Sequence, residues 1–456
     1  MERIPRVLLT LTAVPTLIAG MLTLGLAAPA LADGPGVGTP VIVSMGDSSV
    51  SGEAGRWAGN TTTLPWTQVD ALGSTAYWDT PSGESLPGCH RSKSAEVHVG
   101  VDAAHDQVNS DNLACSGSMT TTYDVDGQPF KPGLDNFLDT SVHNGYSQSL
   151  LLAQYAQTHN VKEVVVRVGV NNIGFDTLVP ACLKAWWTFE LDVSFGLNPT
   201  KSLCSLDPDL TQRFTPAAQA ELKQQIFRAL QTVASDMYDV GYKQNMYSVV
   251  VETYWSPIPP GNQIRYPEDS LQRQTYGGCG VFNADADWLN NTVLPALNTA
   301  LRGAAALFAA EPYYPPIHIL DEQYVLNGHR LCEKTDELLE ASGFARWSDP
   351  GAINVLEWVQ QLKTLTSTVA PYDAKEGAHA NYFGQLAERA CLRMEYNNGN
   401  PIDATCYPGA FSSPPSWPQT GTSTAPGTEW KAPPITHLAG EPVMHLGPLA
   451  PQAAPE

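Results

Sequence analysis

The stretch that decides the fold is PVIVSMGDSSVSGEAGRWAGN, residues 40–60. A short apolar run at positions 41–45 leads directly into Gly46, Asp47 and Ser48. A run of this length that ends in small and polar residues predicts a buried strand followed by a tight turn. The turn is either an ordinary connection to a helix or a device that presents Ser48 for chemistry, and the rest of the chain has to distinguish the two.

Strand and helix signals alternate along the chain after this turn. Short apolar runs predict further strands at residues 108–114, 162–168, 248–254 and 317–320. Apolar residues at helical spacing predict helices near residues 150–157, 216–237, 285–307 and 380–393. We therefore expect an α/β fold: a three-layer, doubly wound, flavodoxin-like parallel sheet of about five strands with helices on both faces. Ligands in such sheets bind beyond the carboxyl ends of the strands, which is where Ser48 falls.

The first 32 residues have the layout of a secretory signal peptide. Arg3 and Arg6 precede an apolar stretch from Val7 to about Leu26, and Ala30-Leu31-Ala32 closes it. This arrangement predicts cleavage after Ala32, with an uncleaved N-terminal anchor as the alternative. No later segment is predicted to span a membrane. We therefore expect a secreted, extracellular protein without a stable membrane anchor.

The composition limits the kinds of partner. The chain has 456 residues and a formal net charge of −21, which disfavours nucleic acid and anionic membranes as partners. Charged residues make up only 16%, while there are 37 Gly and 36 Pro, as in a loop-rich globular protein. We expect a monomer that acts on a small-molecule, lipid or acylated-carbohydrate substrate.

Eight cysteines in an exported chain predict disulfides. Pairing of sequence neighbours is the simplest hypothesis, although the sequence alone does not fix connectivity. The absence of any Cys-x-x-Cys pair argues against a cysteine zinc site. The pairs expected on this basis are Cys89–Cys115, Cys182–Cys204, Cys279–Cys332 and Cys391–Cys406.

The chain divides into a domain and a tail. Residues 33–409 carry the strand and helix signals and are long enough for one large domain with insertions. Residues 410–456 are rich in Pro, Gly, Ser and Thr without apolar periodicity, which predicts a disordered or extended tail.

A serine nucleophile needs a base, and the candidate is His379 in EGAHANYFGQLAERACLR, residues 376–393. Glu376 lies three residues upstream and can fold back over the turn towards the imidazole ring. The alternative is that His379 caps the helix and Glu376 is solvated. Asp102 and His105 have the same spacing but precede the second strand, so we interpret His105 as a surface or packing residue.

Two further segments offer donors for an oxyanion. NLACSGS (112–118) places Gly117 in a tight turn after a short strand, and VGVNNIGF (168–175) places Asn171 just beyond the strongest strand. A backbone N–H and a neutral amide are suitable donors because neither is lost by titration. Each segment also has an ordinary structural explanation, as a glycine turn or an asparagine cap.

Taken together, these segments resemble the SGNH, or GDSL, hydrolase superfamily, and most closely its secreted actinobacterial lipase and esterase branch. The similarity covers residues 40–393. Four blocks carry it: Gly46-Asp47-Ser48; Cys115-Ser116-Gly117 with Asn112; Gly169-Val170-Asn171-Asn172-Ile173-Gly174-Phe175; and His379-Ala380-Asn381 with Gly384-Gln385.

The departures from the family pattern concern mainly the acid. Ser49, Asn172 and Ala380 replace the leucine, aspartate and proline usual in the family. Glu376 stands where the family usually has aspartate. The resemblance therefore leaves three ways to orient His379: Glu376, Asp373 or a backbone carbonyl.

The resemblance implies a serine carboxylic-ester hydrolase, a GDSL-type esterase or lipase that needs no cofactor and no metal. Ser48 would be the nucleophile, His379 the base and Glu376 the acid, with Ser48, Gly117 and Asn171 forming the oxyanion hole. A carbohydrate-directed esterase that removes acetyl groups from polysaccharide is the alternative, and a non-catalytic surface protein is a third hypothesis.

An insertion at about residues 176–214 follows the Asn171 block. It contains Trp186, Trp187, Phe189 and Phe195. We expect it to form either an aromatic lid over the active site or an amphipathic helix packed on the core.

Overall fold

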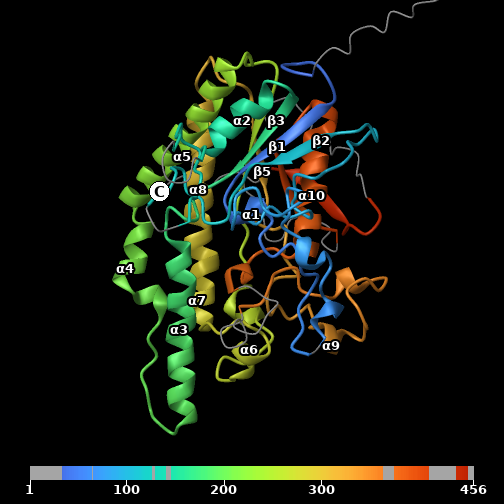
Figure 1. Ribbon diagram of the computed structural model, residues 1–456. Coiled ribbons are helices and arrows are strands. Elements are labelled where there is room, and N and C mark those ends of the chain that lie inside the picture. The colour runs from blue at the N-terminus through green and yellow to red at the C-terminus, as the bar shows by residue number, and fades with distance from the viewer. Residues whose placement is uncertain are drawn as a thin grey trace, which may run out of the picture.

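The computed structural model describes residues 33–63, 65–125, 129–139, 145–362, 374–409 and 438–449. The predicted signal peptide therefore lies outside the described residues. Within them the chain forms an α/β structure built on one sheet (Figure 1). The strands are β1 (Pro40–Gly46), β2 (Asn109–Asn112), β3 (Asn160–Arg167), β4 (Ser248–Glu252), β5 (Ile317–Asp321), β6 (Ala404–Pro408) and β7 (Met444–Pro448).

The helices lie between and around these strands. They are α1 (Ser48–Ser51), α2 (Gln148–Ala156), α3 (Phe175–Ser194), α4 (Pro208–Thr211), α5 (Pro216–Asp239), α6 (Gln272–Thr275), α7 (Asn283–Trp288), α8 (Leu294–Ala309), α9 (Leu339–Ser342) and α10 (Tyr382–Tyr396). One turn of π-helix, Leu289–Val293, joins α7 to α8.

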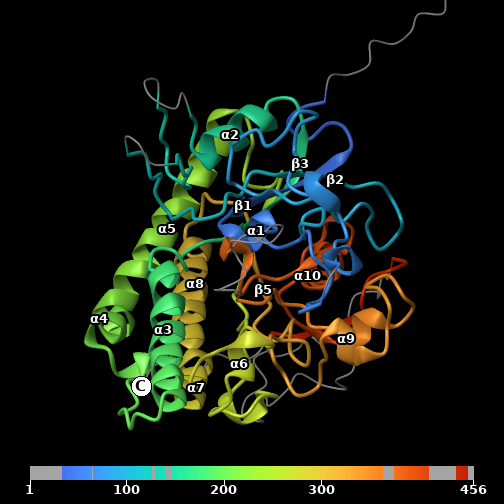
Figure 2. The ribbon, with the colours of Figure 1, turned by 60° about the horizontal axis from the view of Figure 1, so that its bottom comes forward.

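The described residues form a seven-stranded sheet in the order β2-β1-β3-β4-β5-β6-β7. Neighbouring strands are parallel except for the antiparallel pair β6 and β7. The central strands are buried on both faces, which is why they read as continuous runs of valine rather than as alternating patterns. Figures 1 and 2 show α2, α5 and α8 on one face of the sheet and α10 on the other.

The expectation of about five strands was too low. The five predicted strands are present, and β6 and β7 extend the sheet beyond β5. β7 comes from the segment predicted to be a disordered tail, so that prediction was wrong for Met444–Pro448, which pair with β6. The two guanidinium nitrogens of Arg393 also bond the Glu441 carboxylate at 2.6 and 2.7 Å, which fixes this segment against α10.

The long helix α5 begins as its sequence predicts. Thr215 is the N-cap, its hydroxyl accepting a hydrogen bond from the Ala218 N–H at 3.4 Å, and Pro216 occupies the first turn. The buried face of α5 carries Leu222, Ile226, Leu230, Val233 and Met237.

The helix that runs from Asn283 to Ala309 corrects one expectation. Among the described residues it is long and apolar enough to cross a membrane, a property that no segment after the signal peptide was expected to have. Half of its most apolar window is buried, and it packs against α5, β4 and β5. This is the environment of a core helix.

All four predicted disulfides are formed: Cys89–Cys115, Cys182–Cys204, Cys279–Cys332 and Cys391–Cys406. No cysteine in the chain is left free. Four disulfides indicate that the protein folds in an oxidising environment. All four pairs are buried. They link the segments on either side of β2, α3 to the chain that returns from it, two loops through Cys279–Cys332, and α10 to β6.

Candidate active site

The turn after β1 holds Ser48 in a fixed position. Gly46 has a φ of 146°, and a Cβ there would overlap the carbonyl oxygen of Arg167 on β3, so only glycine fits. The Gln148 side chain brackets the Gly46 peptide, accepting from its N–H at 2.7 Å and donating to its carbonyl at 2.9 Å. Asp47 caps α1 by accepting from the Ser49 N–H at 3.0 Å. Ser48 is therefore the first residue of a short, well-anchored helix.

Asp47 supports the turn and is not itself presented. Its carboxylate is fully buried and accepts hydrogen bonds from the Ser49 hydroxyl at 2.8 Å and from the Tyr254 hydroxyl. Burial raises the pKa of Asp47, and the bonds from Tyr254 and Ser49 oppose that rise. The carboxylate acts within the turn as a brace.

Ser48 and His379 lie 331 positions apart in the sequence but are in contact in the structure. The Ser48 Oγ lies 2.7 Å from His379 Nε2, and His379 Nδ1 lies 3.1 Å from the carbonyl oxygen of Gly377. A carbonyl can only accept, so Nδ1 carries the proton and Nε2 presents its lone pair to the Ser48 hydroxyl. This is the tautomer that a general base for serine requires.

The backbone around His379 is held on both sides. The His379 carbonyl accepts from the Gln360 N–H at 2.9 Å, and the Ala378 N–H donates to the Gln360 carbonyl at 2.9 Å. On the other side, the Asn381 side chain caps α10 by accepting from the Phe383 N–H at 3.0 Å. The backbone of His379 therefore lies between a β-bridge and a capped helix.

The carboxylate of Glu376 is directed to two other partners. Oε2 accepts from the Trp57 indole N–H at 2.8 Å and Oε1 accepts from the Tyr77 hydroxyl at 2.5 Å. Of the three ways to orient His379 that the sequence left open, the geometry supports the backbone carbonyl, that of Gly377. Asp373 lies outside the described residues.

A second buried carboxylate acts on His379 at longer range. Glu53 is fully buried and its Oε1 lies 2.7 Å from His90 Nδ1. Burial alone would raise the pKa of Glu53. The hydrogen bond to His90 and the attraction to His90 and His379 outweigh this effect and lower the pKa. Glu53 therefore stays ionised and adds a negative potential at the imidazole of His379.

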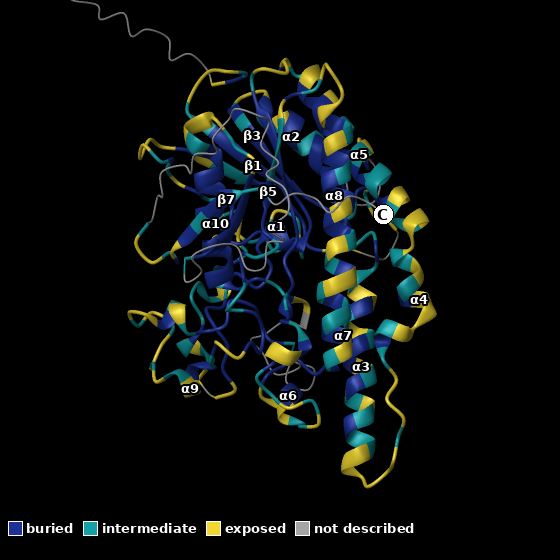
Figure 3. Cartoon of the chain, turned by 180° about the vertical axis from the view of Figure 1, so that it is seen from behind, coloured by how far each residue is buried: buried dark blue, intermediate teal, exposed yellow. Residues whose placement is uncertain are grey.

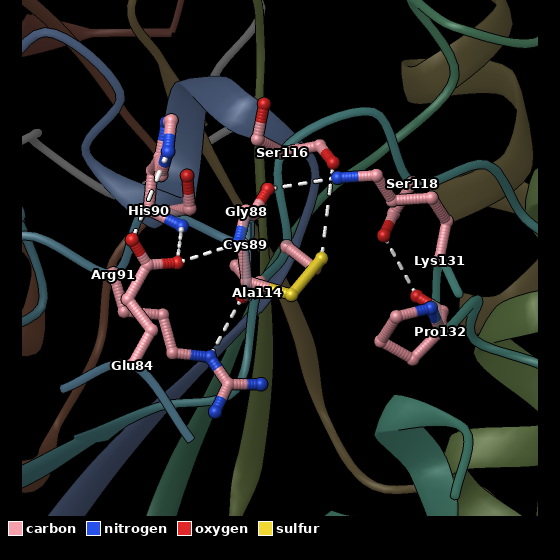
Figure 4. Close-up of a disulfide and its surroundings, with 12 residues drawn as sticks. Glu84, Gly88, Cys89, His90, Arg91, Ala114, Ser116, Ser118, Lys131 and Pro132 are labelled. Atoms are coloured by element: carbon pink, nitrogen blue, oxygen red, sulfur yellow. Dashed lines mark hydrogen bonds and ion pairs between the residues drawn. A yellow bond between two sulfur atoms is a disulfide. The ribbon is translucent and has the colours of Figure 1, made fainter. Parts of the chain in front are cut away.

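The turn that carries Gly117 is pinned by a disulfide (Figure 4). Cys115 is bonded to Cys89, and the Ser116 N–H donates to the Cys89 carbonyl at 3.1 Å. Gly117 has a φ of 82°, a left-handed conformation that favours glycine. The Ser118 N–H closes the turn on the Cys115 carbonyl at 3.0 Å.

Asn171 is tied to the same turn. Its Nδ2 donates to the Ser118 carbonyl at 2.8 Å, which leaves the second amide hydrogen for another acceptor. Within the described part of the chain, no acceptor is found for the backbone N–H of Ser48 or of Gly117. Each of the three predicted oxyanion donors therefore has one N–H group without an acceptor among the described residues.

A cluster of charged side chains lies beneath the carboxyl ends of the central strands. Arg167, at the end of β3, contacts four fully buried glutamates: Glu96, Glu252, Glu322 and Glu388. Burial raises the pKa of Glu96 and Glu322 well above the ordinary value, and Arg167 only partly offsets this.

Three of these carboxylates are close enough together to suggest a metal site, namely Glu96, Glu252 and Glu322. One nitrogen of the Arg167 guanidinium, Nη2, contacts all three. The position that a cation would take is therefore already filled by a positively charged side chain, and the donor set does not fit a metal ion.

The insertion after the Asn171 block begins as the long helix α3. Trp186 is fully buried, with its indole N–H donating to the Glu268 carbonyl at 3.1 Å, and Phe189 packs edge-on against Phe282 at 5.5 Å between ring centroids. These contacts support the packed-helix interpretation for Trp186 and Phe189. Phe195 is 80% exposed and belongs to neither arrangement.

Three other histidines, His90, His98 and His105, have separate surroundings. His105 follows Asp102, whose carboxylate accepts from the Ala104 and Asp106 N–H groups in a local turn. His98 Nδ1 lies 2.9 Å from the Ser110 hydroxyl, and His90 is bound to Glu53.

Sequence reasoning missed the residues that support the site from a distance. Trp57 and Tyr77 hold Glu376, Tyr254 and Gln148 hold the nucleophile turn, and Lys131 donates to the Gly88 carbonyl at 2.8 Å beside the Gly117 turn. A polar or aromatic residue with one distant partner leaves no local pattern.

No protein-family model, curated protein or solved structure matched this chain. The assignment of a function therefore depends on the geometry described above and on the resemblance of the four sequence blocks.

Proposed function

We propose that this chain is a secreted serine carboxylic-ester hydrolase of the SGNH/GDSL type. The observation that carries the proposal is the 2.7 Å contact between Ser48 Oγ and His379 Nε2, with Nδ1 fixed by the Gly377 carbonyl. The strand order β2-β1-β3-β4-β5 supports a flavodoxin-like core, and the disulfides and the N-terminal segment support secretion.

The reaction would begin with transfer of the Ser48 hydroxyl proton to His379 Nε2. The serine oxygen then bonds to the ester carbonyl carbon, and the carbonyl oxygen becomes an oxyanion. The N–H groups of Ser48 and Gly117 and the free amide hydrogen of Asn171 are the donors that would meet this charge. Loss of one such donor typically costs about 10²–10³ in kcat.

The tetrahedral intermediate collapses when the bond to the alkoxide breaks. His379 returns its proton to that alkoxide, so an alcohol leaves and an acyl-serine remains. A water molecule, deprotonated by the same Nε2, attacks the acyl carbon, and a carboxylic acid is released as Ser48 regains its proton. The net reaction consumes the ester and one water molecule and releases an alcohol and a carboxylic acid, and Ser48 and His379 return to their starting protonation states.

The charged form of His379 must be stabilised while it holds the proton. The Gly377 carbonyl supplies the hydrogen bond, and the ionised, buried Glu53 supplies a negative potential. A carbonyl dipole alone is weaker than a carboxylate, so the two together replace a directly bonded acid.

A carbohydrate esterase would use the same groups, so substrates have to separate the two activities. The test is a panel of nitrophenyl esters of increasing chain length and acetylated sugars, assayed with the wild type, Ser48→Ala and Ser49→Ala. Ser48→Ala should lower kcat by a factor on the order of 10⁶. Ser49→Ala is the matched control because it removes a neighbouring hydroxyl that, among the described residues, bonds Asp47 alone, and it should retain most activity. Hydrolysis that survives in Ser48→Ala would contradict the mechanism.

A further inference from the structure

A long hairpin projects from the molecule next to the candidate site. It consists of α3 and the chain that returns from Phe195 to Cys204, and its far end extends beyond all other described parts of the chain (Figures 1 and 3). The Cys182–Cys204 disulfide links the two arms nearer the body. The turn at the far end, residues 193–197, is called the hairpin tip below.

The hairpin tip exposes apolar side chains to solvent. Phe195 is 80% exposed, Leu197 59% and Val193 45%. The segment VSFGLNPT, residues 193–200, contains no charged residue. Single exposed apolar residues are ordinary on protein surfaces, but here three exposed apolar residues fall within five positions of one projecting turn.

The rest of the hairpin is held firmly, which makes the exposure of the tip a property of the fold. Trp186 and Phe189 pack against residues 268–282, and the ammonium of Lys201 lies 5.1 Å from the centroid of the Phe282 ring. Lys201 also pairs with Glu268. The tip has no such partner among the described residues, because the aromatic contacts of α3 end at Phe189.

The size and shape of the hairpin tip determine which kind of partner it can bind. Three side chains exposed to this degree offer on the order of 300 Å² of surface, whereas a stable protein interface buries about 800 Å² on each partner. A second copy of this chain, or a folded protein, would need a groove that complements a narrow convex end. A lipid layer needs no complementary shape, and it accepts Phe and Leu side chains to a depth of about 5–10 Å.

The net charge of the chain limits which lipid headgroups the tip can approach. With a net charge of −21, the protein is repelled from anionic surfaces. We propose that the hairpin tip inserts reversibly into neutral lipid surfaces such as phosphatidylcholine. Binding of the hairpin tip to lipid does not depend on the proposed function. The inference that this binding brings the enzyme to lipid esters rests on the proposed function.

The test is the binding of the full chain to phosphatidylcholine vesicles, measured by co-sedimentation. Ser48→Ala protein is the background, so that hydrolysis cannot alter the vesicles. The double variant Phe195→Asp/Leu197→Asp should bind at least about tenfold more weakly. Tyr313→Asp is the matched control, since Tyr313 is 85% exposed outside the hairpin, and it should bind as the background does.

Three outcomes would overturn the proposal. The first is an absence of vesicle binding by the background protein, and the second is equal binding by the tip variant. The third is a dimer in analytical ultracentrifugation that the tip variant abolishes, because the apolar end would then be covered by a second copy. Hydrolysis of a short, water-soluble nitrophenyl ester, measured with Ser48 intact, should be unchanged in the tip variant. If that hydrolysis is absent from the wild type, the proposed function fails while the vesicle result still stands.

Discussion

Replacement of Glu376 by glutamine distinguishes a catalytic acid from a structural brace. The carboxylate accepts from Trp57 Nε1 at 2.8 Å and from the Tyr77 hydroxyl at 2.5 Å, while Gly377 supplies the contact to His379 Nδ1. Glutamine keeps one acceptor oxygen, so the turn should persist. We expect kcat/KM of Glu376→Gln on a soluble nitrophenyl ester to fall by less than about tenfold. Loss of a directly bonded triad acid costs about 10⁴ in kcat.

The hydrogen bonds that Glu376 accepts also predict the stability of its variants. Bonds to a charged acceptor contribute about 1.5–3 kcal/mol each, so Glu376→Gln should lower the free energy of unfolding by about 1–3 kcal/mol. Glu376→Ala removes the acceptor that serves both the Trp57 indole and the Tyr77 hydroxyl and should cost about 2–6 kcal/mol. Tyr77→Phe removes only the hydroxyl bond to Glu376 and is the control, with an expected cost of about 1 kcal/mol. Urea unfolding followed by tryptophan fluorescence measures all three.

One combination of results would refute this reasoning. If Glu376→Gln lost 10³-fold or more in kcat/KM while its free energy of unfolding stayed at the wild-type value, the carboxylate would be acting on His379 and not on the turn.

The remaining predictions concern the oxyanion hole, the buried carboxylates and one disulfide. Asn171→Ala should lower kcat by about 10²–10³ with little change in KM, and an unchanged kcat would remove Asn171 from the site. Burial, and then repulsion from neighbouring carboxylates, raises the pKa of Glu163 and Glu395 well above the ordinary value, and none of their carboxylate oxygens has a hydrogen-bond partner among the described residues. The stabilisation from a raised carboxyl pKa is complete below the unfolded value and is lost as the pH rises, so the free energy of unfolding should fall from about pH 4 towards neutral. Glu163→Gln should flatten this dependence and stabilise the protein at pH 7 by on the order of 1 kcal/mol, whereas a steeper dependence would contradict the assignment. Removal of the Cys182–Cys204 disulfide by paired serine substitutions should cost about 3 kcal/mol, measured by thermal unfolding, and no change in the melting temperature would indicate that this link does not constrain the unfolded chain.

The parts of the fold that could be predicted are those with strong local signals. Runs such as Val164–Val166 predict buried parallel strands because both faces of such a strand are apolar. Thr215 and Pro216 predict the start of α5 for the same kind of local reason. β6 and β7 were missed because each includes a proline, and because their pairing depends on partners elsewhere in the chain.

The candidate site divides in the same way. Ser48 and His379 lie within recognisable sequence blocks, and the structure brings them into hydrogen-bond contact. The orientation of His379 was not predictable, because it depends on where the Glu376 side chain finds donors. Those donors, Trp57 and Tyr77, lie about 300 positions away in the sequence, and no local pattern reports such a pairing.

The late strand β7 has a consequence for proteolysis. It is joined to β6 only through residues 410–437, yet it is held by a ladder of backbone hydrogen bonds and by the Arg393–Glu441 ion pair. A single cut in the connection would therefore yield two polypeptides that stay assembled under native conditions and separate only in denaturant. A smaller band on a denaturing gel would then not mean a truncated protein, because the terminal fragment would still complete the edge of the sheet.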